Sequence, residues 1–298
     1  MNTMIDFDVD SCLGIGAFGD AYLVHSRIGN TLYADVLKVP AGIINSKLLP
    51  YQPQRKIKPN LEQNLGLLQR EHEALKRIQG HSAIPVLRPY TTYSKLFTKY
   101  ESSITLSMFI QKYKQVAFEK DGSVLIRYAG DCIKVGYDIV SALEYMAHKG
   151  IGLHGDLKPD NVVVRRDADK IRAWIIDFGC SVDKELLNNP SSLLWFAEHV
   201  YIAPEIRDPD EPLPAPNSDV YSVGKILYKA LSRFGSLYKE DKVFVLCSVE
   251  EHFKNMGIGN QIDQVLLPML IKHPQKRFSL AQAQDCLGKL LLKLYKLG

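Results

Sequence analysis

Cysteine is scarce in this sequence, and its distribution excludes two kinds of structural cross-link. The five cysteines stand at positions 12, 132, 180, 247 and 286, with no C-x-x-C pair among them. An odd and scattered set provides neither a disulfide framework nor a zinc site, and it is typical of proteins in a reducing compartment. We therefore expect a cytoplasmic protein without a cysteine-bound metal.

Long apolar runs and strong charge are also missing. No stretch approaches the roughly 18 to 20 uninterrupted apolar residues that a membrane span requires. The acidic N-terminus MNTMIDFDVD lacks the basic region and apolar core of a signal peptide. A formal net charge of +4 is too small to favour nucleic acid as a partner. With 46% hydrophobic residues in 298 positions, the composition predicts a soluble globular protein large enough for two lobes.

The first 40 residues have the pattern of β-strands. Tyr22–Ser26 and Thr31–Val39 are rich in β-branched and aromatic residues, and the hairpin dipeptide Gly29-Asn30 separates them. Period-two alternation places four residues on one face of the second strand: Leu32, Ala34, Val36 and Lys38. The Pro- and Lys-rich stretch 40–60 then predicts a loop, for which a solvated insertion is favoured over a docking site.

A helix is predicted after this loop, and it contains an inward-facing acid. Its apolar stripe consists of Leu61, Leu65, Leu68, Leu75 and Ile78. Glu71 falls on the stripe, whereas Glu73 lies about 140° around the helix from Leu68 and should face solvent. A buried carboxylate without a partner is costly, so we expect Glu71 to pair with Lys38, with Glu73 as the alternative partner.

The remainder of the chain is mainly helical in pattern. A long amphipathic helix through residues 132–146 should end near Lys149-Gly150, and two short strands, Val162–Arg165 and Ile171–Ile176, should follow it. A further helix is expected after Ser218, capped by its hydroxyl, and the last helix carries Leu287, Leu291 and Leu294. The fold class is therefore α+β, with a β-rich N-terminal part and an α-rich C-terminal part.

The motif G-x-G-x-x-G stands at Gly14, Gly16 and Gly19. A dinucleotide-binding site would require a helix directly after the glycines, but a strand follows them here. A glycine-rich turn between antiparallel strands instead suggests a flap whose backbone amides cover phosphates. The alternative for this motif alone is an ordinary glycine-rich hairpin turn.

The strongest signal is the segment HGDLKPDN at 154–161, followed by DFG at 177–179. Asn161 precedes the first strand of the predicted hairpin and Asp177 follows the second, so pairing would bring them to one end, as an oxygen-rich Mg²⁺ site. Asp156 could accept a hydroxyl proton, and Lys158 would add positive charge beside the transferred phosphoryl group. Each residue alone could be an ordinary turn residue, but the ordered set argues against chance.

Together these motifs resemble eukaryotic-type protein kinases of the serine/threonine type, over nearly the whole chain. The resemblance extends to Ala203-Pro204-Glu205 and to SDVYSVG at 218–224. It implies a two-lobed kinase fold, with an N-lobe at about 1–99, a hinge at about 99–103 and a C-lobe at about 104–298. It also implies ATP and Mg²⁺ (or Mn²⁺) as cofactors and a protein substrate.

The resemblance assigns a role to each matching residue. Asp156 would be the catalytic base, helped by Lys158, while Asn161 and Asp177 would hold the metal. The nucleotide-binding residues would be Gly14, Gly16, Gly19, Ala21, Val36, Lys38, Glu71, Val163 and, at the hinge, Thr98 with Lys99 to Glu101. The supporting residues would be His154, Phe178 and Gly179, Asp219 as anchor of the catalytic loop, and Arg277 paired with Glu205.

The sequence departs from the family pattern at several places. Gly155 replaces the common arginine before the catalytic aspartate, and Glu198 replaces a threonine typical of serine/threonine kinases. Without that arginine we expect activity independent of activation-loop phosphorylation, with the loop held by apolar residues at 193–196. Two other classes stay open: a pseudokinase that binds partners, and a small-molecule phosphotransferase of the aminoglycoside or choline kinase kind.

Overall fold

The chain folds into two compact units, and each is described by itself. The computed structural model describes residues 5–16, 18–41, 60–92, 94–120, 122–168, 170–188, 200–207, 213–232, 238–240, 243–245, 253 and 256–297. The first unit comprises Met1–Ser102 and Asp177–Ser181, and the second comprises Ser103–Ile176 and Val182–Gly298. Among the described helices, none is long and apolar enough to cross a membrane.

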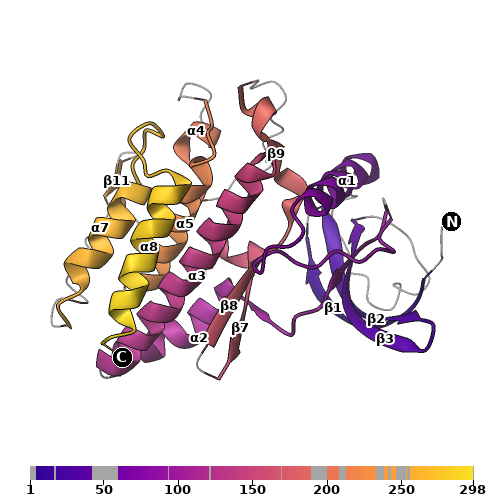
Figure 1. The fold of residues 1–298 in the computed structure, drawn as a ribbon, viewed down its shortest axis with the longest axis horizontal. Coiled ribbons are helices and arrows are strands. Elements are labelled where there is room, and N and C mark those ends of the chain that lie inside the picture. Colours follow the sequence, from indigo (N-terminus) through magenta and orange to yellow (C-terminus); the bar gives the residue numbers. More distant parts are fainter. Residues whose placement is uncertain are drawn as a thin grey trace. The chain divides into compact units, whose positions relative to one another are not determined.

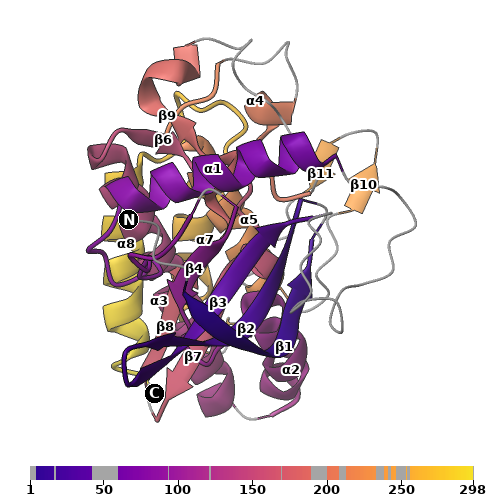
Figure 2. The ribbon, with the colours of Figure 1, turned by 90° about the vertical axis from the view of Figure 1, so that its right-hand side faces the viewer.

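An antiparallel four-stranded sheet forms most of the first unit. Its strands follow the chain in the order β1 (Asp6–Ile15), β2 (Gly19–Ile28), β3 (Thr31–Pro40) and β4 (Leu96–Lys99), and β1 to β3 lie side by side in Figure 2. Gly29, in the turn between β2 and β3, has a φ of 58°, which glycine adopts at little cost. The two strands and the turn predicted here are confirmed, although both strands are longer than predicted.

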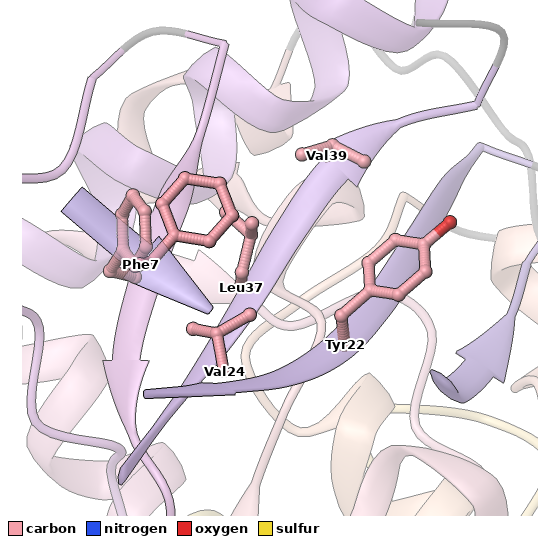
Figure 3. Packing of buried hydrophobic residues seen from close by; sticks show 6 residues of the cluster. Phe7, Tyr22, Val24, Leu37 and Val39 are labelled. Carbon is pink, nitrogen blue, oxygen red and sulfur yellow. The ribbon is translucent and has the colours of Figure 1, made fainter. Parts of the chain in front are cut away.

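The hydrophobic core of this unit lies on one face of the sheet. It contains Phe7, Tyr22, Val24, Leu37, Val39 and Phe97, and the Phe7, Val24 and Leu37 side chains point toward one another in Figure 3. Lys38 therefore lies on the opposite face of β3 from Leu37 and Val39. The predicted alternation along β3 is confirmed, but the face that carries Lys38 is the less buried one.

Helix α1 (Leu61–Arg77) completes the first unit. Asn60 is its N-cap residue and accepts a hydrogen bond from the amide of Gln63 at 3.1 Å. The buried side chains of the helix include Leu68, Glu71 and Leu75, as the sequence predicts. Leu61 is nevertheless 40% exposed although it lies in phase with Leu68, so helical phase alone did not predict its burial. The helix buries Asn64, Leu67 and Ala74 as well.

Helices dominate the second unit. They are α2 (Leu106–Glu119), α3 (Gly122–His148), α4 (Pro204–Arg207), α5 (Ser218–Leu231), α7 (Gly259–Met269) and α8 (Leu280–Leu294). The buried face of α3 packs against α5 and α8, and the three helices lie side by side in Figure 1. Gly150, two residues after the end of α3, has a φ of 85°, so the helix ends near Lys149-Gly150 as the sequence predicts.

Short strands support the loops of the second unit. β5 (Ile104–Thr105), β7 (Val162–Asp167) and β8 (Lys170–Ile175) form one antiparallel sheet, and β6 (Ile151–Leu153) pairs with β9 (Val182–Asp183). A further hairpin joins β10 (Tyr238–Glu240) and β11 (Val243–Val245). The β7–β8 hairpin is confirmed, and it extends closer to its turn than predicted.

The predicted cap of α5 is wrong. Asn217 occupies the N-cap position, and Ser218 is the first residue of the helix. The Ser218 hydroxyl donates to Glu205 Oε1 at 2.7 Å and accepts from the Ala215 amide at 3.1 Å. The hydroxyl bonds a buried carboxylate and an upstream amide, so it does not cap the helix.

Candidate active site

The glycine-rich turn joins β1 to β2 and approaches Lys38 closely. The Gly16 amide donates to the Gly19 carbonyl at 2.9 Å, and a Cβ at Gly16 would lie 2.8 Å from that oxygen. A Cβ at Gly19 would lie 3.0 Å from the Val39 carbonyl and 3.2 Å from Lys38 Cε. Gly14 has nothing within 4 Å of such an atom. Steric crowding therefore requires glycine at the second position of the motif and disfavours a side chain at the third, whereas the first has open space around it.

Lys38 sits between two carboxylates of the first unit. Its Nζ lies 2.6 Å from Glu71 Oε2 and 2.7 Å from Asp177 Oδ1. Burial lowers the pKa of Lys38, but the negative charges of Asp177 and Glu71 outweigh this and raise it overall. Burial and Asp177 raise the pKa of Glu71, while Lys38 opposes them. The predicted Lys38–Glu71 pair is confirmed; Glu73 is exposed and only approaches Lys76, at 3.5 Å.

The DFG segment belongs to the first unit and packs against α1. Phe178 is completely buried and Leu75 is 1% exposed. The Phe178 amide donates a hydrogen bond to the Glu71 carboxylate. Asp177 has a φ of 66°, an uncommon left-handed conformation for a residue with a side chain. Its carboxylate reaches Lys38 and is still 42% exposed. A Cβ at Gly179 would lie 3.4 Å from the Leu67 carbonyl.

The second unit brings Asp156, Lys158 and Asn161 together. Lys158 Nζ and Asn161 Nδ2 both donate to Asp156 Oδ2, each at 2.8 Å. Asn161 Nδ2 also donates to the Asp156 carbonyl at 2.8 Å. Because the amide nitrogen is occupied in this way, the amide oxygen of Asn161 is the atom left to face a cation, which suits a hard metal such as Mg²⁺.

Asn161 also marks the end of the β7–β8 hairpin. Val162 pairs with Ile175, and the Ile176 amide donates to the Asn161 carbonyl at 2.9 Å. Asp177 is the next residue of the chain. The hairpin register on which the metal-site prediction depended is therefore confirmed within the second unit.

Asp219, in the first turn of α5, holds the backbone of the HGDLKPDN segment. Its carboxylate accepts the amides of His154 at 2.6 Å and Gly155 at 3.3 Å. Burial raises the pKa of Asp219 to about 7, although these two hydrogen bonds oppose the shift. The φ of Gly155 is 80°, so this position suits glycine better than a residue with a side chain. His154 is fully buried, with Nε2 3.1 Å from the Ile176 carbonyl.

Glu205 and Arg277 form a buried bidentate ion pair. Arg277 Nη1 and Nη2 lie 2.5 Å and 3.0 Å from the two Glu205 oxygens, and both side chains are completely buried. Arg277 also donates to the carbonyls of Ile271, Lys272 and Asn217. With its donors satisfied, the pair fixes α4 to the segment before α8, which confirms the pairing that the motifs imply.

The residues expected to contact adenine fall in both units. Ala21 pairs with Lys38 and Val36 pairs with Thr98, so these side chains line the face opposite the hydrophobic core. The amide of Lys99 donates to the Val86 carbonyl at 2.9 Å, which leaves only its carbonyl oxygen for a ligand.

At the end of β4, Lys99 Nζ forms an ion pair with Glu101 at 3.0 Å. Val163 lies in β7 of the second unit, opposite Thr105. The assignment of Thr98, Lys99, Glu101 and Val163 to adenine stays a prediction.

One polar network was missed by sequence reasoning. Asp35 is fully buried in β3 and accepts hydrogen bonds from Arg88 Nε, at 2.6 Å, and from the Tyr90 hydroxyl. Burial and the Asp35 hydrogen bond raise the pKa of Tyr90 to about 12. The period-two alternation of β3 places Asp35 on the face of Leu37 and Val39, and this was the signal for its burial.

Several predictions fall outside the described residues. These concern most of the 40–60 loop, Ser191, Ser192, Glu198 and the apolar stretch 193–196.

The sequence matches the family described as Protein kinase domain over residues 7–287. This chain belongs to the protein kinase family. The resemblance drawn from the motifs is thereby confirmed, and with it the two-lobed α+β kinase fold.

Similar proteins include serine/threonine kinases from distant organisms. Serine/threonine-protein kinase AtPK1/AtPK6 of Arabidopsis thaliana is 26% identical over 91% of this chain and 52% of its own length. Serine/threonine-protein kinase PknD of Chlamydia pneumoniae is 25% identical over 92% of the chain and 30% of its own length. An Aurora kinase of Debaryomyces hansenii is 22% identical over 95% of the chain and 62% of its own length. The chain thus spans about a third to two thirds of these relatives.

Proposed function

We propose that this kinase transfers the γ-phosphoryl group of ATP to a serine or threonine hydroxyl of a protein substrate. The observation that carries the proposal is the pair of 2.8 Å hydrogen bonds from Lys158 and Asn161 to one oxygen of Asp156. These bonds fix the orientation of a carboxylate whose side chain is only 12% exposed. A carboxylate oriented in this way suits a general base for a hydroxyl.

Asp156 would take the proton as the new bond forms. The substrate hydroxyl oxygen bonds to the γ-phosphorus, the bond from that phosphorus to the β–γ bridging oxygen breaks, and ADP leaves with the electron pair. The hydroxyl proton passes to Asp156. Lys158, which lies beside Asp156, would stabilise negative charge on the transferred group.

Lys38 and its carboxylate partners would bind the phosphates. With Glu71 holding its ammonium at 2.6 Å, Lys38 can bond α- and β-phosphate oxygens in a fixed position. The amides of the turn at Gly14, Gly16 and Gly19 would cover the phosphates. Asp177 and the amide oxygen of Asn161 would be the protein ligands of Mg²⁺ or Mn²⁺, which would neutralise phosphate charge.

Ala21 and Val36 of the first unit would contact the base of ATP, and the family resemblance assigns Val163 of the second unit to the same role. Thr98 would border this position, and the Lys99 carbonyl and the backbone of Glu101 would bond the adenine edge. This part of the proposal rests on the kinase family pattern and on the face of the four-stranded sheet that Ala21, Val36 and Thr98 share.

Phosphoamino acid analysis separates this proposal from its two rivals. Purified protein is incubated with Mg²⁺, γ-labelled ATP and a generic protein mixture, and in parallel with an aminoglycoside and choline. We expect labelled phosphoserine and phosphothreonine, and none with the Asp156→Asn variant. Label in the small molecules alone would indicate a small-molecule phosphotransferase, and ATP binding without any transfer would indicate a pseudokinase.

A further inference from the structure

Four basic side chains gather in the second unit around the residues next to Ala203-Pro204-Glu205. This basic cluster consists of Lys114 on α2, Lys225 and Lys229 on α5, and Arg207 at the end of α4. Lys229 Nζ donates to the Tyr201 hydroxyl at 2.7 Å and lies 5.3 Å from the centre of its ring. Lys114 Nζ donates to the Lys229 carbonyl at 2.7 Å. The cluster is thus positioned by specific bonds, and Tyr201 holds Lys229.

The basic cluster carries an excess of positive charge. Within the described part of the chain, no carboxylate lies within ion-pair distance of Lys114, Lys229 or Arg207. Burial lowers the pKa of Lys114, and Lys229 lowers it further. Burial likewise lowers the pKa of Lys225 to about 8, with Arg207 adding to the effect. Lys229 and Arg207 thus add positive charge beside two partly buried ammonium groups, and an external anion would stabilise such a cluster.

Helix α5 connects the basic cluster to the residues next to Asp156, and its length sets a scale for the substrate. Asp219 and Lys229 are ten positions apart on α5, which corresponds to about 15 Å at a rise of 1.5 Å per residue. Asp219 holds the amides of His154 and Gly155, which directly precede Asp156. An extended chain covers about 3.3 Å per residue, so four or five residues are as long as the part of α5 between Asp219 and Lys229, and this length sets the spacing that we test.

We propose that the basic cluster binds an acidic side chain of the protein substrate, about four or five residues from the hydroxyl that is phosphorylated. The inference rests on the proposed function and adds the chemical class of its substrate. Lys229 is the main contact because it is exposed and held by Tyr201, while Lys114 supplies the neighbouring charge. A basic residue at the same substrate position would be repelled.

A scanning peptide series tests the inference. The parent peptide has one serine flanked by alanines, and single Glu or Lys substitutions are moved through five positions on either side. Two quantities are measured for each peptide: kcat/KM for phosphorylation and Kd by fluorescence anisotropy. We expect Glu at one or two positions four or five residues from the serine to raise kcat/KM and tighten Kd by about five- to tenfold, and Lys there to weaken both.

A charge-reversal variant tests whether Lys229 is the residue that contacts the acidic side chain of the substrate. In Lys229→Glu the ratio of kcat/KM for the Glu and Lys peptides should invert, and in Lys229→Ala it should approach one. The matched control is Lys296→Glu, which makes the same charge change at an exposed position and should keep the wild-type ratio. Circular dichroism melts of each variant exclude misfolding as the cause.

The two proposals fail in different ways. If the wild type phosphorylates the parent peptide but no Glu position changes kcat/KM or Kd by more than twofold, the acidic-substrate inference is wrong and the kinase function stands. If no peptide is phosphorylated, the kinase function fails, and the Kd series alone decides the inference. Retention of the preference for Glu peptides in the Lys229→Glu variant would also overturn the acidic-substrate inference.

Discussion

Single replacements of Lys38 and of its two candidate partners, Glu71 and Glu73, should show that loss of a buried charge costs more folding stability than loss of an exposed one. Glu71 is 4% exposed and lies 2.6 Å from Lys38 Nζ, whereas Glu73 is exposed and lies 3.5 Å from Lys76 Nζ. The chemical change Glu→Gln is the same at both positions. Any difference between the two variants therefore reports the environment of the carboxylate.

The structure sets the expected order of the effects. Lys38→Ala leaves Glu71 buried beside Asp177 without a cation, and removal of one partner from a buried pair costs about 3 to 5 kcal/mol. Glu71→Gln leaves Lys38 its second bond, 2.7 Å to Asp177. Its cost should therefore be nearer that of one charge-assisted hydrogen bond, about 1 to 3 kcal/mol. Glu73→Gln removes an exposed contact and should cost less than about 0.5 kcal/mol.

Urea titrations followed by far-ultraviolet circular dichroism measure these differences in the free energy of unfolding. The dependence of this free energy on urea concentration is compared among the variants. Lys38→Ala and Glu71→Gln should also lose kinase activity, and Glu73→Gln should retain it. If Glu73→Gln lowers the free energy of unfolding as much as Glu71→Gln does, the assignment of the buried acid is wrong.

Three further predictions follow from the site. Asp177→Asn should raise the Mg²⁺ concentration required for half-maximal activity at least tenfold, since the ion loses a carboxylate ligand; an unchanged requirement would contradict the metal assignment. The pKa of Asp219 is raised to about 7 in the folded state from an ordinary value near 4. The folded state therefore binds this proton more tightly than the unfolded state does, and the resulting stabilisation, complete below about pH 4, is lost as the pH rises through about 7. Asp219→Asn should therefore flatten the decline in unfolding free energy between pH 5 and 7.5, and an equally steep decline would refute this. Because Gly155 has no side chain, the triple alanine variant of Ser181, Ser191 and Ser192 should keep its initial rate; a loss of more than about tenfold, some 1.4 kcal/mol on the barrier, would show that a loop phosphate matters.

Sequence reasoning was most successful where a motif and a periodicity coincide. Glu71 was identified because its helical phase agreed with the need of Lys38 for a partner. The Glu205–Arg277 pair followed from the resemblance to the kinase family, although its two residues are 72 positions apart.

Predictions from the sequence failed where one sequence pattern is compatible with two different structures. Ser218 stands where a capping residue is expected, but the buried carboxylate of Glu205 takes its hydroxyl instead. Leu61 lies on the apolar side of its helix and is nevertheless exposed, because helical phase gives the direction of a side chain but not which parts of the protein pack against it. The bond from Lys229 to Tyr201 joins residues 28 positions apart without a motif, so only the structure could reveal it.

The most direct test of the central claim compares two aspartates of one loop. Asp156 is 8% exposed and receives two side-chain hydrogen bonds, whereas Asp160 is exposed. Turnover of Mg·ATP with a serine peptide is measured for wild type, Asp156→Asn and Asp160→Asn, with ATP affinity measured in parallel. We predict that Asp156→Asn lowers kcat by about 10² to 10⁴ while ATP affinity is retained, and that Asp160→Asn keeps kcat within a few fold. Equal kcat values in wild type and Asp156→Asn would contradict the account.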